Sequence, residues 1–132
     1  MAQGGFAFCH RFRVRWSEVD PQNVVFNARY LDYADLGITE YWRHVDFRNS
    51  GGAGPMDFHV AHAEVAFRKP IKPDEVIDIW CKTEKFGTTS MTISARAERR
   101  ERDGSFTETV ATGRFTFVAV DDANRPRPCT PD

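Results

Sequence analysis

The chain has no apolar run long enough to cross a membrane as a helix, because polar or charged residues interrupt every hydrophobic stretch. It has no excess of either charge, since 18 Lys and Arg stand against 19 Asp and Glu. That balance argues against a surface dominated by nucleic-acid contacts. Residues 1–12 lack the apolar core of a signal peptide. We therefore expect no nucleic acid and no membrane among the partners of this protein.

Cysteine is scarce and forms no recognisable motif. Cys9, Cys81 and Cys129 are odd in number and share no metal-binding or redox spacing. This pattern favours a reducing, cytoplasmic setting over a disulfide framework, and we interpret the three thiols as packing or tail residues. No Gly-x-Ser-x-Gly elbow is present, which excludes a serine hydrolase of the α/β type. No nucleotide-binding glycine motif is present either.

The 132 residues, 41% of them hydrophobic, are enough for one domain with its own core. We expect a single domain over residues 1–132, with 122–132 as a loosely ordered, proline-rich tail. Apolar and polar residues alternate from Phe6 to Trp16, which predicts a half-buried strand. Its polar side carries Arg11, Arg13 and Arg15. Such a stripe can bind phosphate, but a solvated sheet face is the commoner reason for it.

A long amphipathic helix is predicted next. From Tyr30 to Trp42 the apolar residues form a wide band around the helix, opposite a narrow polar stripe. Asn27 is placed to cap the start, because its side chain can accept an amide hydrogen of the first turn. Gly37, inside the apolar band, would let a strand approach closely. So wide a band indicates a helix covered by a sheet.

The remaining chain predicts four strands, at residues 58–69, 76–86, 88–102 and 106–120, with a hairpin turn at Asp103-Gly104. A strand, a helix and four more strands, without βαβ alternation, predict an α+β fold. We expect one long central helix against a five-stranded antiparallel sheet. The uncovered face of that sheet would carry Trp80, Val110 and Val118 among polar residues. We therefore expect this face to be buried against a second copy.

His59 and His62 look like a metal-binding pair at first sight. Residues three apart on a regular strand point to opposite faces, so we do not expect them to bind one metal ion. His62 shares a face with Glu64 and Arg68, where these side chains either line an interfacial pocket or form an ordinary polar sheet face. The glycine-rich segment 49–55 is predicted to be a flexible loop.

The segment between the first strand and the helix holds the best candidate for chemistry. Pro21 pushes Asp20 away from helical geometry, which holds a carboxylate beside a helix start. Unpaired N–H groups at that start suit a developing oxyanion, and the carboxylate could attack an electrophilic carbon or activate water. Alternatively, Asp20 only closes the turn, as Asp-Pro sequences often do. Glu18 could form a carboxylate pair with Asp20, but we interpret it as a solvated residue at the strand end.

Three groups of residues in this region occur in a characteristic order: the Asp20-Pro21 turn, the Val24-Val25-Phe26-Asn27 step, and Tyr30-Leu31-Asp32-Tyr33. Together they resemble the hotdog-fold acyl-CoA thioesterases, and most closely the 4-hydroxybenzoyl-CoA thioesterase group. The resemblance extends over residues 8–128. It implies a hotdog fold, in which a helix is wrapped by an antiparallel sheet. It also implies homodimers whose sheets join edge to edge, often paired further into homotetramers, with active sites at the dimer interface.

The resemblance also implies roles for individual residues. Asp20 matches the acid that carries catalysis, and the backbone N–H of Asn27 matches the group that polarises the thioester carbonyl. The family lines its acyl pocket with residues of the strand that here holds Phe58, His59 and His62. We add Tyr30, in the first turn of the helix, to these expected pocket residues.

This chain departs from the family at three places. Asn23 stands where the family has Gly, and Asn tolerates the left-handed conformation of that turn. Asn27 stands where a related subgroup has His. Residues 87–90 (Gly-Thr-Thr-Ser) stand where the hydroxybenzoyl enzyme has basic residues that hold the CoA phosphates.

The resemblance therefore implies an acyl-CoA thioesterase that converts acyl-CoA and water into a free acid and CoA, with no metal or redox cofactor. Asp20 as general base and Asp20 as nucleophile both fit. The alternatives are cleavage of acyl-carrier-protein thioesters, hydration of an enoyl thioester, and thioester binding without catalysis. A hydratase would normally use an Asp–His pair near the helix start, and no His stands between Asp20 and Arg43. A cone-shaped fold of the ketosteroid-isomerase type usually begins with helices, whereas this chain begins with a strand.

Overall fold

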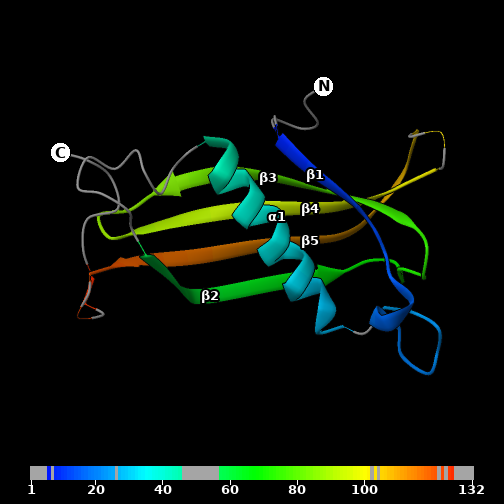
Figure 1. The fold of residues 1–132 in the computed structure, drawn as a ribbon. Helices are drawn as coiled ribbons and strands as arrows, with labels where there is room; N and C mark the ends of the chain where they lie inside the picture. Colours follow the sequence, from blue (N-terminus) through cyan, green and yellow to red (C-terminus); the bar gives the residue numbers. More distant parts are fainter. Residues whose placement is uncertain are drawn as a thin grey trace.

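The computed structural model describes residues 6, 8–25, 27–45, 57–101, 103, 105–121, 123 and 125–126. These residues form one helix against one five-stranded sheet, whose strands lie in the order β1-β3-β4-β5-β2 (Figure 1). In chain order the elements are β1 (Phe8–Arg13), the 3-10 turn η1 (Trp16–Glu18), α1 (Arg29–Val45), β2 (Asp57–Phe67), β3 (Val76–Phe86), β4 (Ser90–Arg100) and β5 (Phe106–Val120). All neighbouring strands pair antiparallel, which confirms the predicted α+β architecture.

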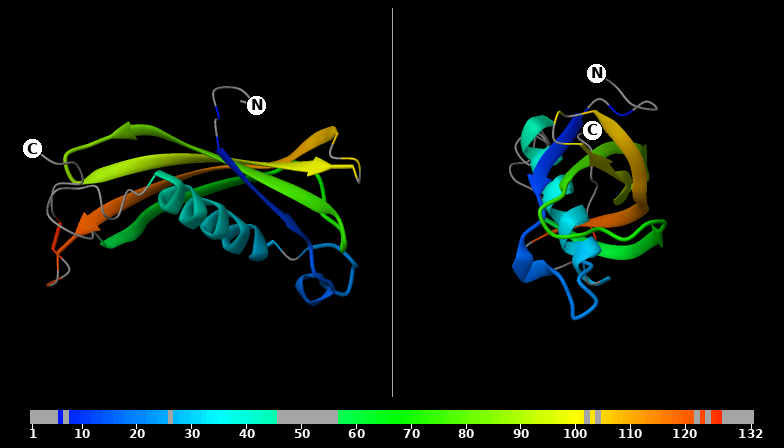
Figure 2. Two further views of the ribbon diagram at one scale, coloured as in Figure 1. Left: turned by 45° about the horizontal axis from the view of Figure 1, so that its top comes forward. Right: turned by 90° about the vertical axis from the view of Figure 1, so that its right-hand side faces the viewer.

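The sheet curves around α1, so the helix lies in the hollow of one sheet face (Figure 2). We call this the inner face and the opposite one the outer face. Apolar side chains of the inner face and of the helix form the core, in which Ile38, Ile79 and Ile93 are at most 2% exposed. Each such side chain contributes about 1.5–3 kcal/mol by its burial. A helix wrapped by a sheet in this way is the expected hotdog arrangement.

Gly37 lies where the helix comes closest to β3. A Cβ atom at this position would stand 2.5 Å from Cγ2 and 2.9 Å from Cβ of Ile79. Both distances are far shorter than van der Waals contact, so only glycine fits without a shift of helix or strand. The predicted close approach is therefore confirmed, and it fixes the height of α1 above the sheet.

Gly37→Ala should destabilise the protein by about 1–2 kcal/mol. Alanine gains about 1 kcal/mol of helix propensity, but forcing a methyl group into a filled core typically costs about 1–3 kcal/mol, and the clash here is with a fully buried side chain. Urea unfolding measures the difference. Asp35→Ala, at an exposed position of the same helix, is the control and should not lower stability. A Gly37→Ala variant more stable than wild type would contradict this packing.

Strand β1 is shorter than the alternating pattern predicts. It pairs with β3 only from Val76 to Cys81, and the expected continuation to Trp16 is wrong, since Trp16 opens η1 with 67% of its surface exposed. Beyond the end of this pairing, the hydroxyl oxygen of Tyr41 accepts the N–H of Thr83 at 3.1 Å. A helix side chain thus binds a backbone N–H of β3 beyond the described pairing with β1.

A bulge in β2 changes the faces on which its histidines lie. The register shifts between Val60 and His62, so that His59 pairs with Val118 and His62 with Thr116. Because Val118 and Thr116 lie two apart on β5, they share a face, and their partners share it too. The expectation that His59 and His62 point to opposite faces is therefore wrong. Both lie on the outer face of the sheet.

A second bulge turns Val110 toward the core. In the β4–β5 ladder Ala97 pairs with Ala111 and Glu98 with Thr109, so Val110 is the extra residue. It is fully buried in the core cluster, and its expected place on the outer face is wrong. Trp80 was expected to be covered by a second copy of the chain, but it is already buried within one chain, with 6% exposed. The outer face is thus less apolar than the sequence indicates.

The outer face carries a ladder of ion pairs. Asp78, whose side chain is 1% exposed, accepts hydrogen bonds from Arg11 at 2.7 and 3.0 Å and from Arg100 at 2.9 Å. Arg100 also donates to Glu98 at 2.8 Å, and Arg96 pairs with Glu98 at 3.1 Å. These arginines offset the cost of burying two carboxylates. Arg11 keeps 52% of its side chain exposed, as expected for a solvated sheet face, and also pairs with a buried carboxylate.

Two predicted segments fall outside this description. The flexible loop expected at 49–55 lies outside the described residues, as does most of the tail expected at 122–132. The hairpin predicted at Asp103-Gly104 is described in part. There β4 and β5 pair directly, and the Asp103 carboxylate accepts the N–H of Ser105 at 2.9 Å.

Candidate functional site

Asp20 opens a tight turn between η1 and α1. Its N–H donates to the carbonyl oxygen of Val24, and its carbonyl oxygen accepts the N–H of Asn23, both at 2.9 Å. Its Oδ1 accepts the N–H of Gln22 at 2.9 Å. Asn23 has a φ of 64°, the left-handed conformation that asparagine was expected to tolerate in place of the family's glycine. Asp20 is therefore half-buried, with one carboxylate oxygen closing the turn.

The residues after the turn fasten it to the rest of the protein. Val25 forms a β-bridge with Val19 and donates its N–H to the carbonyl oxygen of Ile71 at 2.7 Å. Asn27 follows, and its carbonyl oxygen accepts the N–H of Tyr30 at 3.1 Å. The helix itself begins two residues beyond Asn27, within the usual variation of helix boundaries. The Asp20 turn thus leads directly to the start of α1, where the first N–H groups have no partner inside the helix.

Glu18 is a buried carboxylate in this region, and the expectation that it is solvated at a strand end is wrong. It is 7% exposed. Its Oε1 accepts the N–H of Arg15 at 2.8 Å and the hydroxyl of Tyr33 at 3.0 Å, and its Oε2 accepts Nη2 of Arg15 at 3.0 Å. Burial pushes the pKa of Glu18 up, but the hydrogen bonds from Arg15 and Tyr33 outweigh burial and hold the pKa below its usual value. Glu18 is therefore ionised at neutral pH.

Tyr33 is the partner that sequence reasoning missed. It is 4% exposed, and burial together with the hydrogen bond to Glu18 raises its pKa, so the phenol stays protonated. Two signals could have found this contact. Glu18 stands three residues after Arg15, the spacing at which a glutamate closes the start of a helix. In addition, a buried tyrosine hydroxyl usually has a polar partner.

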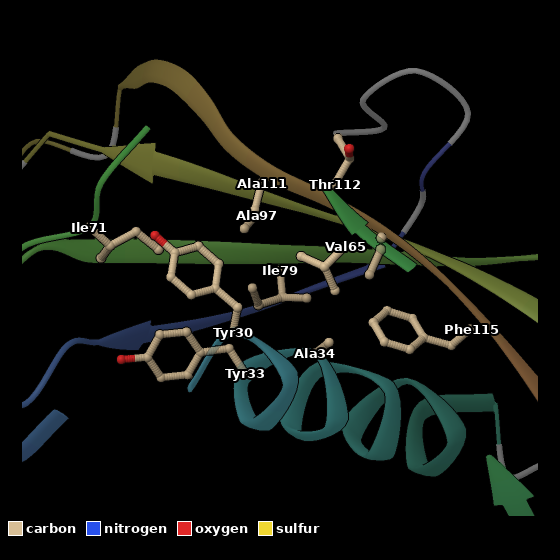
Figure 3. A pocket seen from close by; sticks show the side chains of 12 residues that line it. Tyr30, Tyr33, Ala34, Val65, Ile71, Ile79, Ala97, Ala111, Thr112 and Phe115 are labelled. Atoms are coloured by element: carbon tan, nitrogen blue, oxygen red, sulfur yellow. The ribbon is translucent and has the colours of Figure 1, made fainter. Parts of the chain in front are cut away.

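An apolar pocket lies between the first half of α1 and the inner face of the sheet (Figure 3). Tyr30 and Tyr33 stand at one end and Phe115 at the other. Ile71, whose carbonyl oxygen holds Val25, also lines the pocket and so links it to the Asp20 turn by one hydrogen bond. The pocket's volume is about 20 Å³, room for about one water molecule. Small residues from the helix and two strands line it: Ala34, Ala95, Ala97, Ala111 and Gly113.

The hydroxyl groups of the two tyrosines are both engaged by protein groups. That of Tyr30 donates to the carbonyl oxygen of Lys69 at 3.3 Å, and that of Tyr33 donates to Glu18. Burial raises the pKa of Tyr30 as well. The two rings therefore offer the pocket their carbon faces, and the wall that includes Tyr30 is apolar.

The other three predicted site residues lie away from this pocket. The ring of Phe58 packs against Trp42, with centroids 5.2 Å apart, toward the last turns of α1. His59 and His62 are exposed on the outer face of β2, where Nε2 of His62 lies 2.8 Å from Oε1 of Glu64. Within one chain, the structure places the predicted catalytic pair and Tyr30 around the start of α1. It does not bring these three residues to them.

Cys9 and Cys81 agree with their interpretation as packing residues. Cys9 and Cys81 are free thiols, and burial raises the pKa of Cys81 to about 12 and also raises that of Cys9. Neither is therefore a thiolate at neutral pH, while Cys129 lies outside the described residues. In the described ranges, no three His, Cys, Asp or Glu side chains gather to hold a metal ion, and no helix is long and apolar enough to span a membrane.

Comparison with known proteins gives consistent results. A family model described as the thioesterase-like superfamily matches residues 14–132. An uncharacterized acyl-CoA thioester hydrolase of Zymomonas mobilis is 34% identical over 67 residues, which are 51% of this chain and 45% of that relative. The match thus spans less than half of the relative's length.

Two solved structures share the fold over nearly the whole chain. A probable thioesterase from Bartonella henselae gives a TM-score of 0.79 at 23% identity and covers 92% of this chain and 97% of its own. A thioesterase from Thermus thermophilus, solved with coenzyme A and zinc, gives a TM-score of 0.76 at 28% identity, with 94% and 91% covered. These similarities confirm the hotdog fold.

Proposed function

We propose, since the chain belongs to the thioesterase-like superfamily, that it hydrolyses acyl-CoA thioesters to a free acid and CoA. The observation that carries the proposal is Asp20, a half-buried carboxylate in a turn that leads through Val25 and Asn27 to the start of α1. The relatives' names support the same substrate class. The Zymomonas relative is called an acyl-CoA thioester hydrolase, and the Thermus thioesterase was solved with coenzyme A.

In the proposed reaction the thioester carbonyl lies at the start of α1. The N–H of Asn27 stabilises the oxyanion that forms when the carbonyl carbon becomes tetrahedral, and the helix dipole favours the same charge. Asp20 either takes a proton from the attacking water or attacks the carbon itself to form an anhydride, which water then hydrolyses. In both routes the C–S bond breaks and the CoA thiolate takes up a proton. Water is therefore the only co-substrate.

The acyl group is proposed to bind at the apolar pocket beside Tyr30. The pocket's volume of about 20 Å³ must increase on binding to enclose it. Because the hydroxyl groups of Tyr30 and Tyr33 are engaged elsewhere, this pocket favours an apolar acyl group over one with a polar substituent. The reaction transfers no electrons, and the carboxylate and helix start supply the base and the electrostatic stabilisation. The proposal therefore includes no metal or redox cofactor, and dialysis against EDTA should leave turnover unchanged.

We also propose that the protein is a homodimer formed through β2. Among the described strands, β2 is one edge of the sheet and has β5 as its single neighbour, and it exposes 57% of Val60 and 51% of Phe67. An edge strand with exposed apolar side chains is ready to pair with another strand, and a two-fold axis would place β2 beside the β2 of a second copy. The predicted pocket role of Phe58, His59 and His62 depends on this dimer.

Val60→Lys should shift the protein toward monomers, because a lysine on an edge strand opposes pairing with another strand. We expect the dimer dissociation constant to rise at least about tenfold, equivalent to about 1.4 kcal/mol, as measured by sedimentation equilibrium. Leu36→Lys, at a 39% exposed site on α1, is the matched control and should leave the mass unchanged. An intact Val60→Lys dimer would exclude β2 as the interface. A wild-type mass of four chains would reveal the homotetramer.

Thiol release from a panel of acyl- and aroyl-CoA esters tests the proposed function. Turnover that is lost in Asp20→Asn supports it. Release only from acyl-carrier-protein esters would favour that substrate class, and hydration of a crotonyl thioester without thiol release would favour a hydratase. Tight CoA binding with no turnover, unchanged by Asp20→Asn, would favour a non-catalytic module. A cytoplasmic location stays a prediction from the cysteine content.

A further inference from the structure

The buried carboxylate of Glu18 takes no part in the chemistry described so far. Burying a carboxylate costs free energy unless the group is paired and hydrogen-bonded. The three hydrogen bonds of Glu18 reach two places, Arg15 at the beginning of η1 and Tyr33 on α1. Glu18 therefore ties the segment that leads into the Asp20 turn directly to the helix.

The Asp20 turn is held on two sides. After the turn, Val25 is fixed by its bridge to Val19 and by its hydrogen bond to Ile71. Before the turn, Glu18 makes the contact with the helix, through Tyr33. The hydrogen bonds inside the turn set its shape, whereas these outer contacts set its orientation toward the helix start. Removal of the Glu18–Tyr33 contact would keep the shape and release the orientation.

We propose that Glu18 is the positioning residue for Asp20, which holds the Asp20 carboxylate at its working distance from the N–H groups at the start of α1. This inference rests on the proposed thioesterase function. Positioning matters here because the carboxylate must reach the thioester carbon, or a water beside it, while the helix start binds the carbonyl oxygen. A displacement of about 1 Å between such groups can cost about 10²-fold in rate.

The partners of Glu18 suit a fixed tether. An ionised carboxylate can accept from the Arg15 N–H, the Arg15 guanidinium and the Tyr33 hydroxyl at once, whereas a protonated acid would lose acceptor capacity. Glu18 is ionised at neutral pH and Tyr33 is neutral there, for the reasons given above. The contact is therefore a charge-assisted hydrogen bond in a buried site, the stronger kind.

Variants at both ends of the tether test the inference by steady-state kinetics. Glu18→Ala should lower kcat about 10²-fold, and Tyr33→Phe should lower it about tenfold, since it removes only the link between Glu18 and the helix. KM should change little in both. Glu18→Gln keeps an acceptor for Tyr33 and the Arg15 N–H and should recover most of the rate. Glu18→Ala added to Asp20→Asn should cost little more than Asp20→Asn alone, because misplacing an amide removes no further catalysis.

Hydrogen exchange supplies a readout that does not depend on turnover. Exchange in residues 15–25, followed by mass spectrometry, should rise in Glu18→Ala and Tyr33→Phe, with exchange in β3, β4 and β5 unchanged. Glu40→Ala is the matched control, since it removes a glutamate of α1 that pairs with Arg43 at 3.2 Å. It should change neither kcat nor exchange.

The outcomes separate this inference from the proposed function. No turnover in the wild type would end the proposed function, while the exchange experiment would still test the tether. An active wild type with full kcat in Glu18→Ala would overturn the positioning role. Unchanged exchange in residues 15–25 would overturn it as well. If Glu18→Ala fails to fold, Tyr33→Phe decides, because it keeps the paired carboxylate and removes only the link to the helix.

Discussion

Asp20→Asn should lower kcat for thioester hydrolysis by about 10³-fold and leave KM nearly unchanged. A positioned general base typically contributes about 10²–10⁴-fold, and a carboxylate nucleophile is lost completely in the amide. The substitution keeps the turn, because the side-chain oxygen of Asn can still accept the N–H of Gln22. The N–H groups at the helix start also remain, so some acceleration over the uncatalysed reaction should persist. Thiol release at saturating ester measures the effect.

Asp103→Asn is the matched control for this experiment. The Oδ1 of Asp103 accepts the N–H of Ser105, two residues on, at 2.9 Å, the same local arrangement that Asp20 makes with Gln22. Full activity in Asp103→Asn beside a collapse in Asp20→Asn would separate a catalytic carboxylate from one that only closes a turn. Equal activity in both variants would mean that Asp20 only closes the turn and has no catalytic role.

A single turnover in ¹⁸O-labelled water would distinguish the two roles of Asp20. In the nucleophile route, water can open the anhydride at the aspartyl carbon and leave the isotope in the protein. In the base route, the isotope goes to the product acid alone. Isotope in the peptide that contains Asp20 would therefore identify the nucleophile.

Asp78→Ala should destabilise the protein by about 3 kcal/mol. Asp78 is buried and accepts hydrogen bonds from two arginines, Arg11 and Arg100. Its removal leaves these guanidinium groups without that carboxylate, and Arg100 is only 10% exposed. Breaking a buried ion pair from one side costs about 3–5 kcal/mol, and the exposure of Arg11 sets the expected value near the lower end. Denaturant unfolding gives the number.

Asp32→Ala provides the comparison at the surface. Asp32 pairs with Arg29 at 3.3 Å, and its side chain is 66% exposed, so its loss should cost no more than about 0.5 kcal/mol. A loss near 3 kcal/mol for Asp78 and a negligible one for Asp32 would establish that burial, and not charge pairing itself, makes the ladder important. A loss below about 1 kcal/mol for Asp78 would mean that water, or Glu98 in the case of Arg100, satisfies the arginines in its place.

The elements of the fold follow from local patterns, and the failures come from interruptions of those patterns. Strands β3 and β5 have the predicted bounds because their alternation is long and ends at turn residues. The rule that alternate residues of a strand lie on the same face of the sheet no longer holds once one residue is inserted. The bulge between Val60 and His62 reverses the face assignment of His59, and the bulge at Val110 turns that side chain into the core.

In the candidate site, too, the features set by neighbouring residues could be predicted, and those set by distant residues could not. The constrained turn at Asp20 and the left-handed Asn23 could be predicted, because proline and asparagine act on their own backbone neighbourhood. The burial of Glu18 depends on Tyr33, and that of Asp78 on Arg100, partners that lie in other elements. A single sequence does not show which distant side chain meets a carboxylate. Burial of these acids therefore became visible only in the structure.

The contact between Tyr41 and Thr83 affects where a further strand could join the sheet. Among the described residues, β1 pairs with β3 only from Val76 to Cys81, and beyond Cys81 the Tyr41 hydroxyl accepts the N–H of Thr83 that an added strand would need. The edge strands of the described sheet are β1 and β2, and beyond β1 a further strand could pair with β3 only by displacing the Tyr41 hydroxyl.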